Sequence, residues 1–203
     1  DGPAAEVDHQ IQAIEACLRQ AGATDLTHAD TPEARQRLWA GRKAAFPAMG
    51  RISPDYYCMD GTIPRGQLAT VLGRIEDLSE HFGLRVANVF HAGDGNLHPL
   101  VLYDSNQPGE LEKAEEFGAE ILKLCVAVGG VLSGEHGIGV EKRDLMPCMF
   151  TDDDLDLQEE VRDAFDPRGL LNPGKVYPTL RQCAEGKTHV HGGQWAFPDL
   201  ERF

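Results

Sequence analysis

The chain lacks a long apolar run, a cysteine pair and an excess of basic residues. Its apolar stretches, such as 121–128, are far shorter than the roughly 20 residues that a membrane-spanning helix needs, so we expect no transmembrane segment. Acidic residues outnumber basic ones by 33 to 19, and a net charge of -14 argues against a nucleic-acid partner, which requires a basic stripe. The five cysteines are odd in number and form no C-x-x-C pair, which favours reduced thiols in a cytoplasmic protein.

Helix-like and strand-like patterns alternate along the chain. Apolar residues at helical spacing predict helices over 4–21, 32–46, 64–83, 108–128 and 152–165. Strand-like runs occur over 26–29, where the signal is weak, and over 56–63, 85–90 and 97–103. Strands joined by a hairpin and by single helices predict an α+β fold with an antiparallel sheet.

The most informative segment is the predicted hairpin over 89–98, which reads VFHAGDGNLH. Its Asp-Gly pair between apolar runs predicts a two-residue type I′ turn. That register places His91 opposite His98, with Asn96 on the same face, because residues two apart in a strand point the same way. Two imidazoles would then lie close enough to bind one metal ion. The alternative is a pair of exposed surface histidines.

A glycine-rich loop over 132–139, which reads LSGEHGIG, carries a second pair of candidate residues. Glycines reach backbone conformations closed to larger residues and let a ligand approach the main chain. Glu135 could complete a His-His-Glu metal set that keeps open positions for a substrate. His136 would remain free as a general base near neutral pH. The alternative is a glycine-rich connector with a solvated Glu-His pair.

Two further segments give weaker signals. Arg42 lies on the predicted helix 32–46, and an arginine can hold a carboxylate through two parallel hydrogen bonds. The alternative for Arg42 is a solvated charge on a helix surface. The run 171–175, which reads LNPGK, is also explained by an ordinary Pro-Gly turn.

Three runs, HAGDGNLH (91–98), GEHGIG (134–139) and LNPGK (171–175), together resemble one protein family. In order and spacing they are similar to the C-terminal half of FAD-linked 2-hydroxy-acid dehydrogenases of the vanillyl-alcohol-oxidase superfamily, of the glycolate-oxidase and D-lactate-dehydrogenase type. The resemblance implies a ferredoxin-like substrate (cap) domain over 1–140, lacking its first strand, with helices on one face of the antiparallel sheet. It also implies a C-terminal helical and loop segment over 141–203 that packs on a flavin domain absent from this sequence.

The resemblance further implies the roles of the site residues. His91, His98 and Glu135 would bind a divalent metal, zinc or manganese, which holds the hydroxyl and a carboxylate oxygen of a small 2-hydroxy acid. His136 would remove the hydroxyl proton, and a hydride would pass from the substrate carbon to FAD. The chemistry is coherent, because a bound metal lowers the pKa of the hydroxyl and a flavin supplies the two-electron step.

Four other residues receive roles from the same resemblance. Arg42 and Asn96 would contact the substrate, and Asn172 and Lys175 would lie near the flavin, which is bound mainly by the absent domain. The family also implies an iron–sulfur partner subunit and a cytoplasmic location, peripheral to the inner membrane through partner subunits. We expect this chain to be a portion of a longer enzyme and to be inactive alone.

The hydroxyglutarate-oxidising members of the family carry a lysine where Cys58 stands and a threonine where Phe46 stands. The absence of this lysine and this threonine from the present sequence favours a short monocarboxylic substrate such as glycolate or lactate. Two other functions remain open: a metal-dependent hydrolase that uses the same His-His-Glu set, and a non-enzymatic metal-binding or subunit-docking module. The run 171–175, with the acidic helix before it, disfavours the hydrolase, which has no reason to share it.

Overall fold

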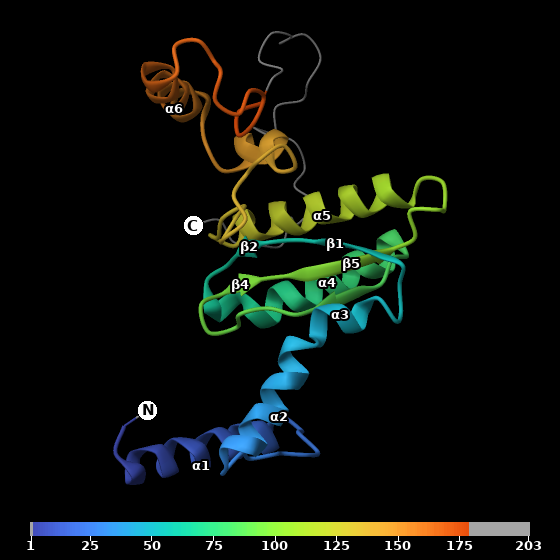
Figure 1. The fold of residues 1–203 in the computed structure, drawn as a ribbon, viewed down its shortest axis with the longest axis vertical. Coiled ribbons are helices and arrows are strands. Elements are labelled where there is room, and N and C mark those ends of the chain that lie inside the picture. Colours follow the sequence, from blue (N-terminus) through green and yellow to red (C-terminus); the bar gives the residue numbers. More distant parts are fainter. Residues whose placement is uncertain (1, 179–203) are drawn as a thin grey trace. The chain divides into compact units, whose positions relative to one another are not determined.

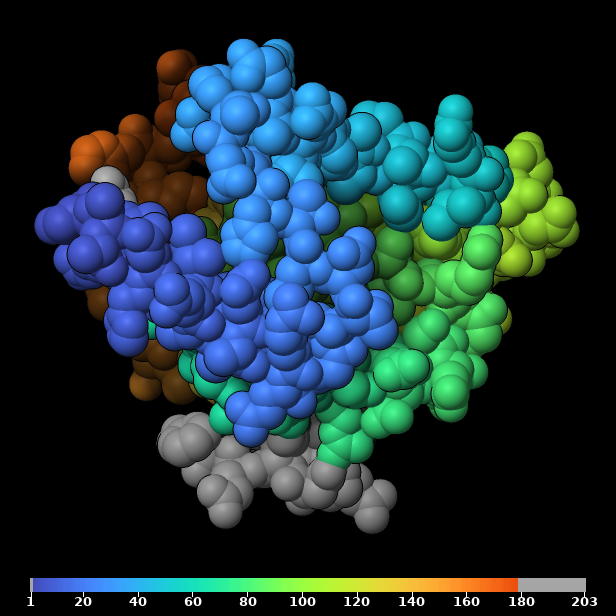
Figure 2. Space-filling model, turned by 90° about the horizontal axis from the view of Figure 1, so that it is seen from below, coloured from blue at the N-terminus to red at the C-terminus, as the bar shows by residue number. Residues whose placement is uncertain are grey.

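The computed structural model describes residues 2–178, and these fall into two compact units that divide between Ala45 and Phe46. The first unit consists of α1 (Ala4–Gln20) and α2 (Pro32–Lys43). Every residue of both helices is partly or fully exposed, and their side chains form the blue surface in Figure 2. The predicted strand over 26–29 is wrong: this segment is an irregular connection, since a short strand without a partner is not stable.

The second unit contains the sheet. Its elements are α3 (Ala45–Met49, which begins at the boundary), β1 (Asp55–Cys58), β2 (Gly61–Thr62), η1 (Arg65–Gln67), α4 (Leu68–Phe82), β3 (Val86–Asn88), β4 (Asn96–Leu97), β5 (Pro99–Tyr103), α5 (Glu110–Ala127), η2 (Arg143–Cys148) and α6 (Asp152–Phe165). They can be followed along the chain by colour in Figure 1.

The sheet is antiparallel and has a ferredoxin-like order. β5 lies between β1 and β3, and β2 pairs with β4 in the register that β1 and β5 already share. A bridge between Thr62 and Val131 adds the segment after α5 on the outer side of β2. The chain therefore follows the order β-α-β-β-α-β, with the last strand reduced to one bridge. The predicted α+β fold with an antiparallel sheet is confirmed.

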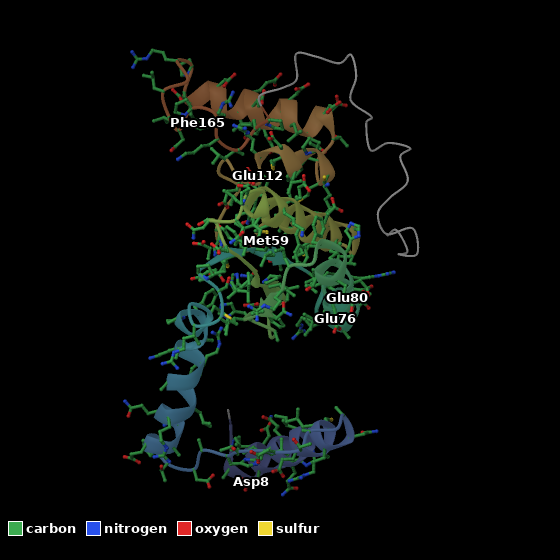
Figure 3. The ribbon with its side chains drawn as sticks, turned by 90° about the vertical axis from the view of Figure 1, so that its right-hand side faces the viewer. Asp8, Met59, Glu76, Glu80, Glu112 and Phe165 are labelled. Carbon is green, nitrogen blue, oxygen red and sulfur yellow. The ribbon has the colours of Figure 1, made fainter. Side chains whose placement is uncertain are left out.

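Both long helices of this unit pack on one face of the sheet. Ile75 of α4 and Phe117 of α5 share a buried core with Val101 of β5 and with Met59, which lies between β1 and β2. Figure 3 shows Met59 close beneath α5, whereas Glu76 lies on the outer side of α4. Because side chains alternate along a strand, the neighbours of these core residues point to the opposite face. That face carries the candidate site.

The segment after the sheet continues the same core. Met146 of η2 and Leu155 of α6 are buried in the cluster that holds Leu132 and the sheet residues. Thr151 begins α6 with a capping box, in which its hydroxyl accepts from the Asp154 amide and the Asp154 carboxylate accepts from the Thr151 amide. The predicted domain boundary at 140/141 stays a prediction. None of the helices within residues 2–178 is long and apolar enough to cross a bilayer.

Candidate active site

The hairpin that carries the two histidines differs from its predicted form. His91 pairs with Asn96 instead of His98, so the loop is Ala92–Gly95 and the two-residue turn is wrong. Gly95 is the last residue of this longer turn, and its carbonyl accepts a hydrogen bond from the Ile63 amide on the neighbouring strand segment (3.0 Å). The register shift is two residues, and a shift by an even number keeps every side chain on its face.

The two histidines therefore still converge, as diagonal neighbours across the strand pair. Their ring centroids are 5.5 Å apart and their planes are inclined by 82°. Glu135 Oε1 lies 3.2 Å from His98 Nε2 and 3.6 Å from His91 Nε2. Ligand atoms about 2.1 Å from a tetrahedral ion are about 3.4 Å from each other, so these separations fit one cation. The structure brings the three predicted ligands together, and their metal-binding role stays a prediction.

The surroundings of His98 also fit a metal ligand. Its ring is almost fully buried, and Nδ1 lies 3.1 Å from the carbonyl oxygen of Met59. A carbonyl only accepts, so in the neutral ring Nδ1 carries the proton and Nε2 presents a lone pair to the Glu135 carboxylate. A cation between these two electron-rich atoms would satisfy both of them. A backbone partner on the far nitrogen is typical of histidines that bind metal.

Asn96 supports Glu135 from the same strand. Its Nδ2 atom donates to Glu135 Oε1 (2.7 Å), and its Oδ1 atom accepts from the Thr62 hydroxyl (3.4 Å). The residue is buried, so its side chain is held in one orientation. The predicted contact between Asn96 and the substrate stays a prediction; in the structure this amide orients a candidate metal ligand.

His136 lies beside the candidate metal set without joining it. Its ring stacks on that of His98, with centroids 5.4 Å apart and planes inclined by 14°. Its side chain is half exposed, and Nδ1 lies 4.0 Å from the Asp60 carboxylate. The exposed side of this imidazole is open to a substrate, and the role of His136 as a general base stays a prediction.

The sequence analysis missed Asp60. This fully buried carboxylate accepts hydrogen bonds from the Ser133 hydroxyl (2.6 Å), the His136 amide (2.8 Å) and the buried Lys142 ammonium (3.1 Å). Burial alone would raise the pKa of Asp60, but these hydrogen bonds and that of the Glu135 amide outweigh it and hold the pKa well below its usual range. The available signal was that Asp60 is the one charged residue in the predicted strand 56–63. Nothing in the sequence marks Lys142.

A second group of residues in the described part of the chain, Asp60, His98 and His136, is also compact enough to surround an ion. The Asp60 carboxylate of this group already accepts hydrogen bonds from its neighbours. The same Asp60 oxygen accepts from the Ser133 hydroxyl, Lys142 and the His136 amide, so it has no lone pair left for a cation. Of the two groups, His91, His98 and Glu135 are therefore the better candidate metal ligands.

The remaining predicted residues lie elsewhere. Arg42 is in the last turn of α2, in the first unit, and its contact with a substrate carboxylate stays a prediction. Asn172 and Lys175 bind each other (2.9 Å) in the loop after α6, and both are exposed. The Val176 amide attaches that loop to Gly139, at the end of the site loop (2.8 Å). Their place near a flavin stays a prediction.

Gly134 packs so closely against Asn96 and Thr62 that a larger residue there would disturb the site. A Cβ atom there would lie 2.5 Å from Asn96 Oδ1 and 2.5 Å from Thr62 Oγ1. Because Asn96 is buried and bonded to Glu135, it cannot move without releasing that ligand. We expect Gly134→Ala to weaken Zn²⁺ binding by about 10-fold or more, the effect typical of damaged outer-shell contacts. The control is Gly93→Ala in the nearby hairpin loop, where the added methyl group meets open space, and this variant should bind Zn²⁺ like the wild type. Competition with a chelator measures the affinities, and equal affinities for Gly134→Ala and the wild type would contradict the prediction.

Comparison with known proteins decides the family. The family described as "FAD linked oxidases, C-terminal domain" matches residues 1–176. The chain belongs to this family. "Glycolate oxidase subunit GlcD" of Escherichia coli (strain K12) is 58% identical over 204 aligned residues, which cover 100% of this chain and 41% of that protein.

Other relatives within the family are more distant. "Glycolate oxidase subunit GlcD" of Bacillus subtilis (strain 168) is 33% identical over 87% of this chain and 38% of its own length. "D-lactate dehydrogenase" of Anaerostipes hadrus is 34% identical over 81% of this chain and 35% of its own length. The chain thus spans well under half of these relatives.

Proposed function

We propose that this chain is the C-terminal part of a flavin-dependent 2-hydroxy-acid dehydrogenase of the glycolate or D-lactate type, which oxidises the substrate hydroxyl to a 2-oxo acid. The observation that carries the proposal is the convergence of His91, His98 and Glu135 with His136 stacked beside them. The names of the relatives, a glycolate oxidase subunit and D-lactate dehydrogenases, support the substrate class.

Within this proposal, His91, His98 and Glu135 hold a divalent cation, and two imidazoles with a carboxylate suit zinc or manganese. The cation, when bound, lowers the pKa of the substrate hydroxyl and stabilises negative charge on it, and FAD supplies the two-electron step. Arg42 is assigned to the substrate carboxylate, Asn96 to the substrate itself, and Asn172 and Lys175 to the flavin.

His136 takes the hydroxyl proton. Its half-exposed ring is accessible to a substrate, and stacking on the buried His98 fixes its plane. When His136 accepts a proton, the carboxylate of Asp60, 4.0 Å from Nδ1, stabilises the positive ring. A positioned base of this kind contributes about 10²–10⁴-fold to the rate.

The wall beside the site favours a small substrate. Phe46 of α3 contacts His98 edge-on, with ring centroids 6.4 Å apart. Cys58 pairs with Leu100, diagonal to His98, and burial together with the Asp60 charge raises the pKa of its thiol to about 11, so the thiol is neutral. A distal substrate carboxylate would find no cation at either position, which favours glycolate or lactate over 2-hydroxyglutarate.

This specificity can be reversed by design. Phe46→Thr with Cys58→Lys, in the complete enzyme, should raise kcat/KM for 2-hydroxyglutarate relative to glycolate by about 10-fold or more, because a charge-assisted hydrogen bond contributes about 1.5–3 kcal/mol. Phe46→Thr with Cys58→Met keeps the length of the side chain without its charge and should give no such gain. Preference of the unaltered enzyme for 2-hydroxyglutarate would refute the small-substrate proposal.

The proposed function itself is tested by flavin reduction. The complete enzyme, mixed anaerobically with glycolate or D-lactate, should lose its oxidised-flavin absorbance in a single turnover. Absence of reduction by every 2-hydroxy acid would contradict the proposal. Ester or amide hydrolysis would then favour the metal hydrolase, and metal binding without turnover would favour the docking module.

We also propose that the parent enzyme is cytoplasmic and that an iron–sulfur subunit accepts its electrons. The strongly acidic composition, with a net charge of -14, would suit a basic partner surface.

A further inference from the structure

Three consecutive backbone amides point at one buried carboxylate beneath the site loop. The amides of Gly134, Glu135 and His136 lie 3.1, 3.2 and 2.8 Å from Asp60 Oδ2. Successive amides that converge on one point form an anion-binding concavity. In this chain the anion is Asp60, which belongs to the strand segment between β1 and β2.

Two side chains complete this arrangement. The Ser133 hydroxyl donates to Asp60 (2.6 Å) and accepts from the Gly137 amide (2.8 Å), which joins the two ends of the loop. Lys142 donates to both Asp60 and Ser133, each at 3.1 Å. Asp60 is fully buried and Lys142 is 3% exposed, so each charge depends on the other for compensation.

Besides the Asp60 carboxylate, the loop is held by Asn96, which donates to Glu135 (2.7 Å), and by the Gly134 amide, which also donates to the main-chain carbonyl of Asp60 (2.9 Å). Gly134, Glu135, His136 and Gly137 are exposed, so side-chain packing contributes little to their order. The glycines that bracket the loop leave its backbone many conformations, and fixing each residue costs about 1–2 kcal/mol of conformational entropy. The Asp60 carboxylate accepts from the amides of Glu135 and His136, and these bonds restrain the backbone of both residues.

We propose that Asp60, with Lys142, is a positioning residue that fixes the loop 133–137 so that Glu135 faces His91 and His98 while His136 stacks beside them. The proposal rests on the metal site described under the proposed function. Asp60 acts through the backbone of the loop and binds neither metal nor substrate.

The test uses the 203-residue chain and the double variant Asp60→Asn with Lys142→Met, which removes both buried charges at nearly constant volume. Amide hydrogen exchange is followed by NMR in the metal-free protein, and Co²⁺ affinity is measured by titration of the chain with the metal alone. Leu155→Ala, a core truncation, is the control for general loss of stability. The Leu102 amide, bonded to the Arg85 carbonyl in the sheet (2.8 Å), is the internal reference.

We expect the amides of Glu135 and His136, which donate to the Asp60 carboxylate, to exchange at least about 10-fold faster in the double variant, while the Leu102 amide keeps its protection. Co²⁺ affinity should fall about 10–100-fold, the range for lost outer-shell support. Leu155→Ala should change neither the relative exchange of the loop nor the affinity. Wild-type exchange at the loop, or wild-type Co²⁺ affinity, would overturn the proposal.

Two further outcomes are informative. If the double variant does not fold, Asp60→Asn alone carries the same test: faster exchange of the Glu135 and His136 amides supports the proposal and unchanged exchange overturns it. If the wild-type chain binds no Co²⁺, the proposed metal site fails, and loop exchange alone decides the role of Asp60.

Discussion

Replacing His98 with alanine should lower the affinity of the chain for Zn²⁺ by at least about 100-fold, because loss of a direct ligand exceeds the 10–100-fold cost of losing an outer contact. His98 is the buried member of the set, with 6% of its side chain exposed against 50% for His91 and 52% for Glu135. The Met59 carbonyl orients its ring, so the substitution removes a ligand atom that is already in place. Competition with a chromogenic chelator measures the change.

A matched control is available in the same unit. His81→Ala removes a histidine from the last turn of α4, where its ring contacts Phe82. This variant should bind Zn²⁺ as the wild type does. Equal affinities for the wild type and His98→Ala would show that the imidazoles of the hairpin do not hold the ion.

Replacing His136 with asparagine should lower kcat of the complete enzyme by about 10²–10⁴-fold, because an amide cannot accept the hydroxyl proton. Zn²⁺ affinity should stay within a few-fold of the wild type, since this ring stacks on His98 and is not a member of the His91, His98 and Glu135 set. Pre-steady-state flavin reduction reports the affected step directly.

His98→Ala and His136→Asn together separate a ligand from a base. If His136→Asn lowered Zn²⁺ affinity as strongly as His98→Ala, the ion would be assigned to the group that contains Asp60 instead of Glu135. If kcat were unchanged, another group would have to take the proton.

The fold was predictable where alternation and helical spacing are clear. The runs 56–63 and 97–103 gave the two long strand segments, and the helices that follow them, α4 and α5, cover one face as expected. The prediction of a strand over 26–29 was wrong because these four residues have no neighbouring strand to complete their backbone hydrogen bonds. Local pattern cannot report whether a partner strand exists.

The convergence of His91 and His98 was predicted for a partly wrong reason. The Asp-Gly pair favours a two-residue turn, but pairing of Gly95 with Ile63 lengthens the loop. The prediction of a shared face survived because the register moved by an even number of residues. A slip of one residue would have separated the two rings.

Asp60 and Lys142 were not predicted because their roles depend on contacts between distant segments. Asp60 accepts bonds from a loop more than 70 positions further along the chain, and Lys142 reaches it from 82 positions away. An acidic residue within a strand suggests a function, but only the folded chain shows that three amides surround it.

The claim that His91, His98 and Glu135 hold one divalent cation is tested most directly by anomalous diffraction at the zinc edge, from crystals of the chain grown with Zn²⁺. We predict one peak at about 2.0–2.2 Å from Nε2 of each histidine and from a Glu135 carboxylate oxygen. A peak beside Asp60 and His136, or no peak near the hairpin, would contradict the assignment.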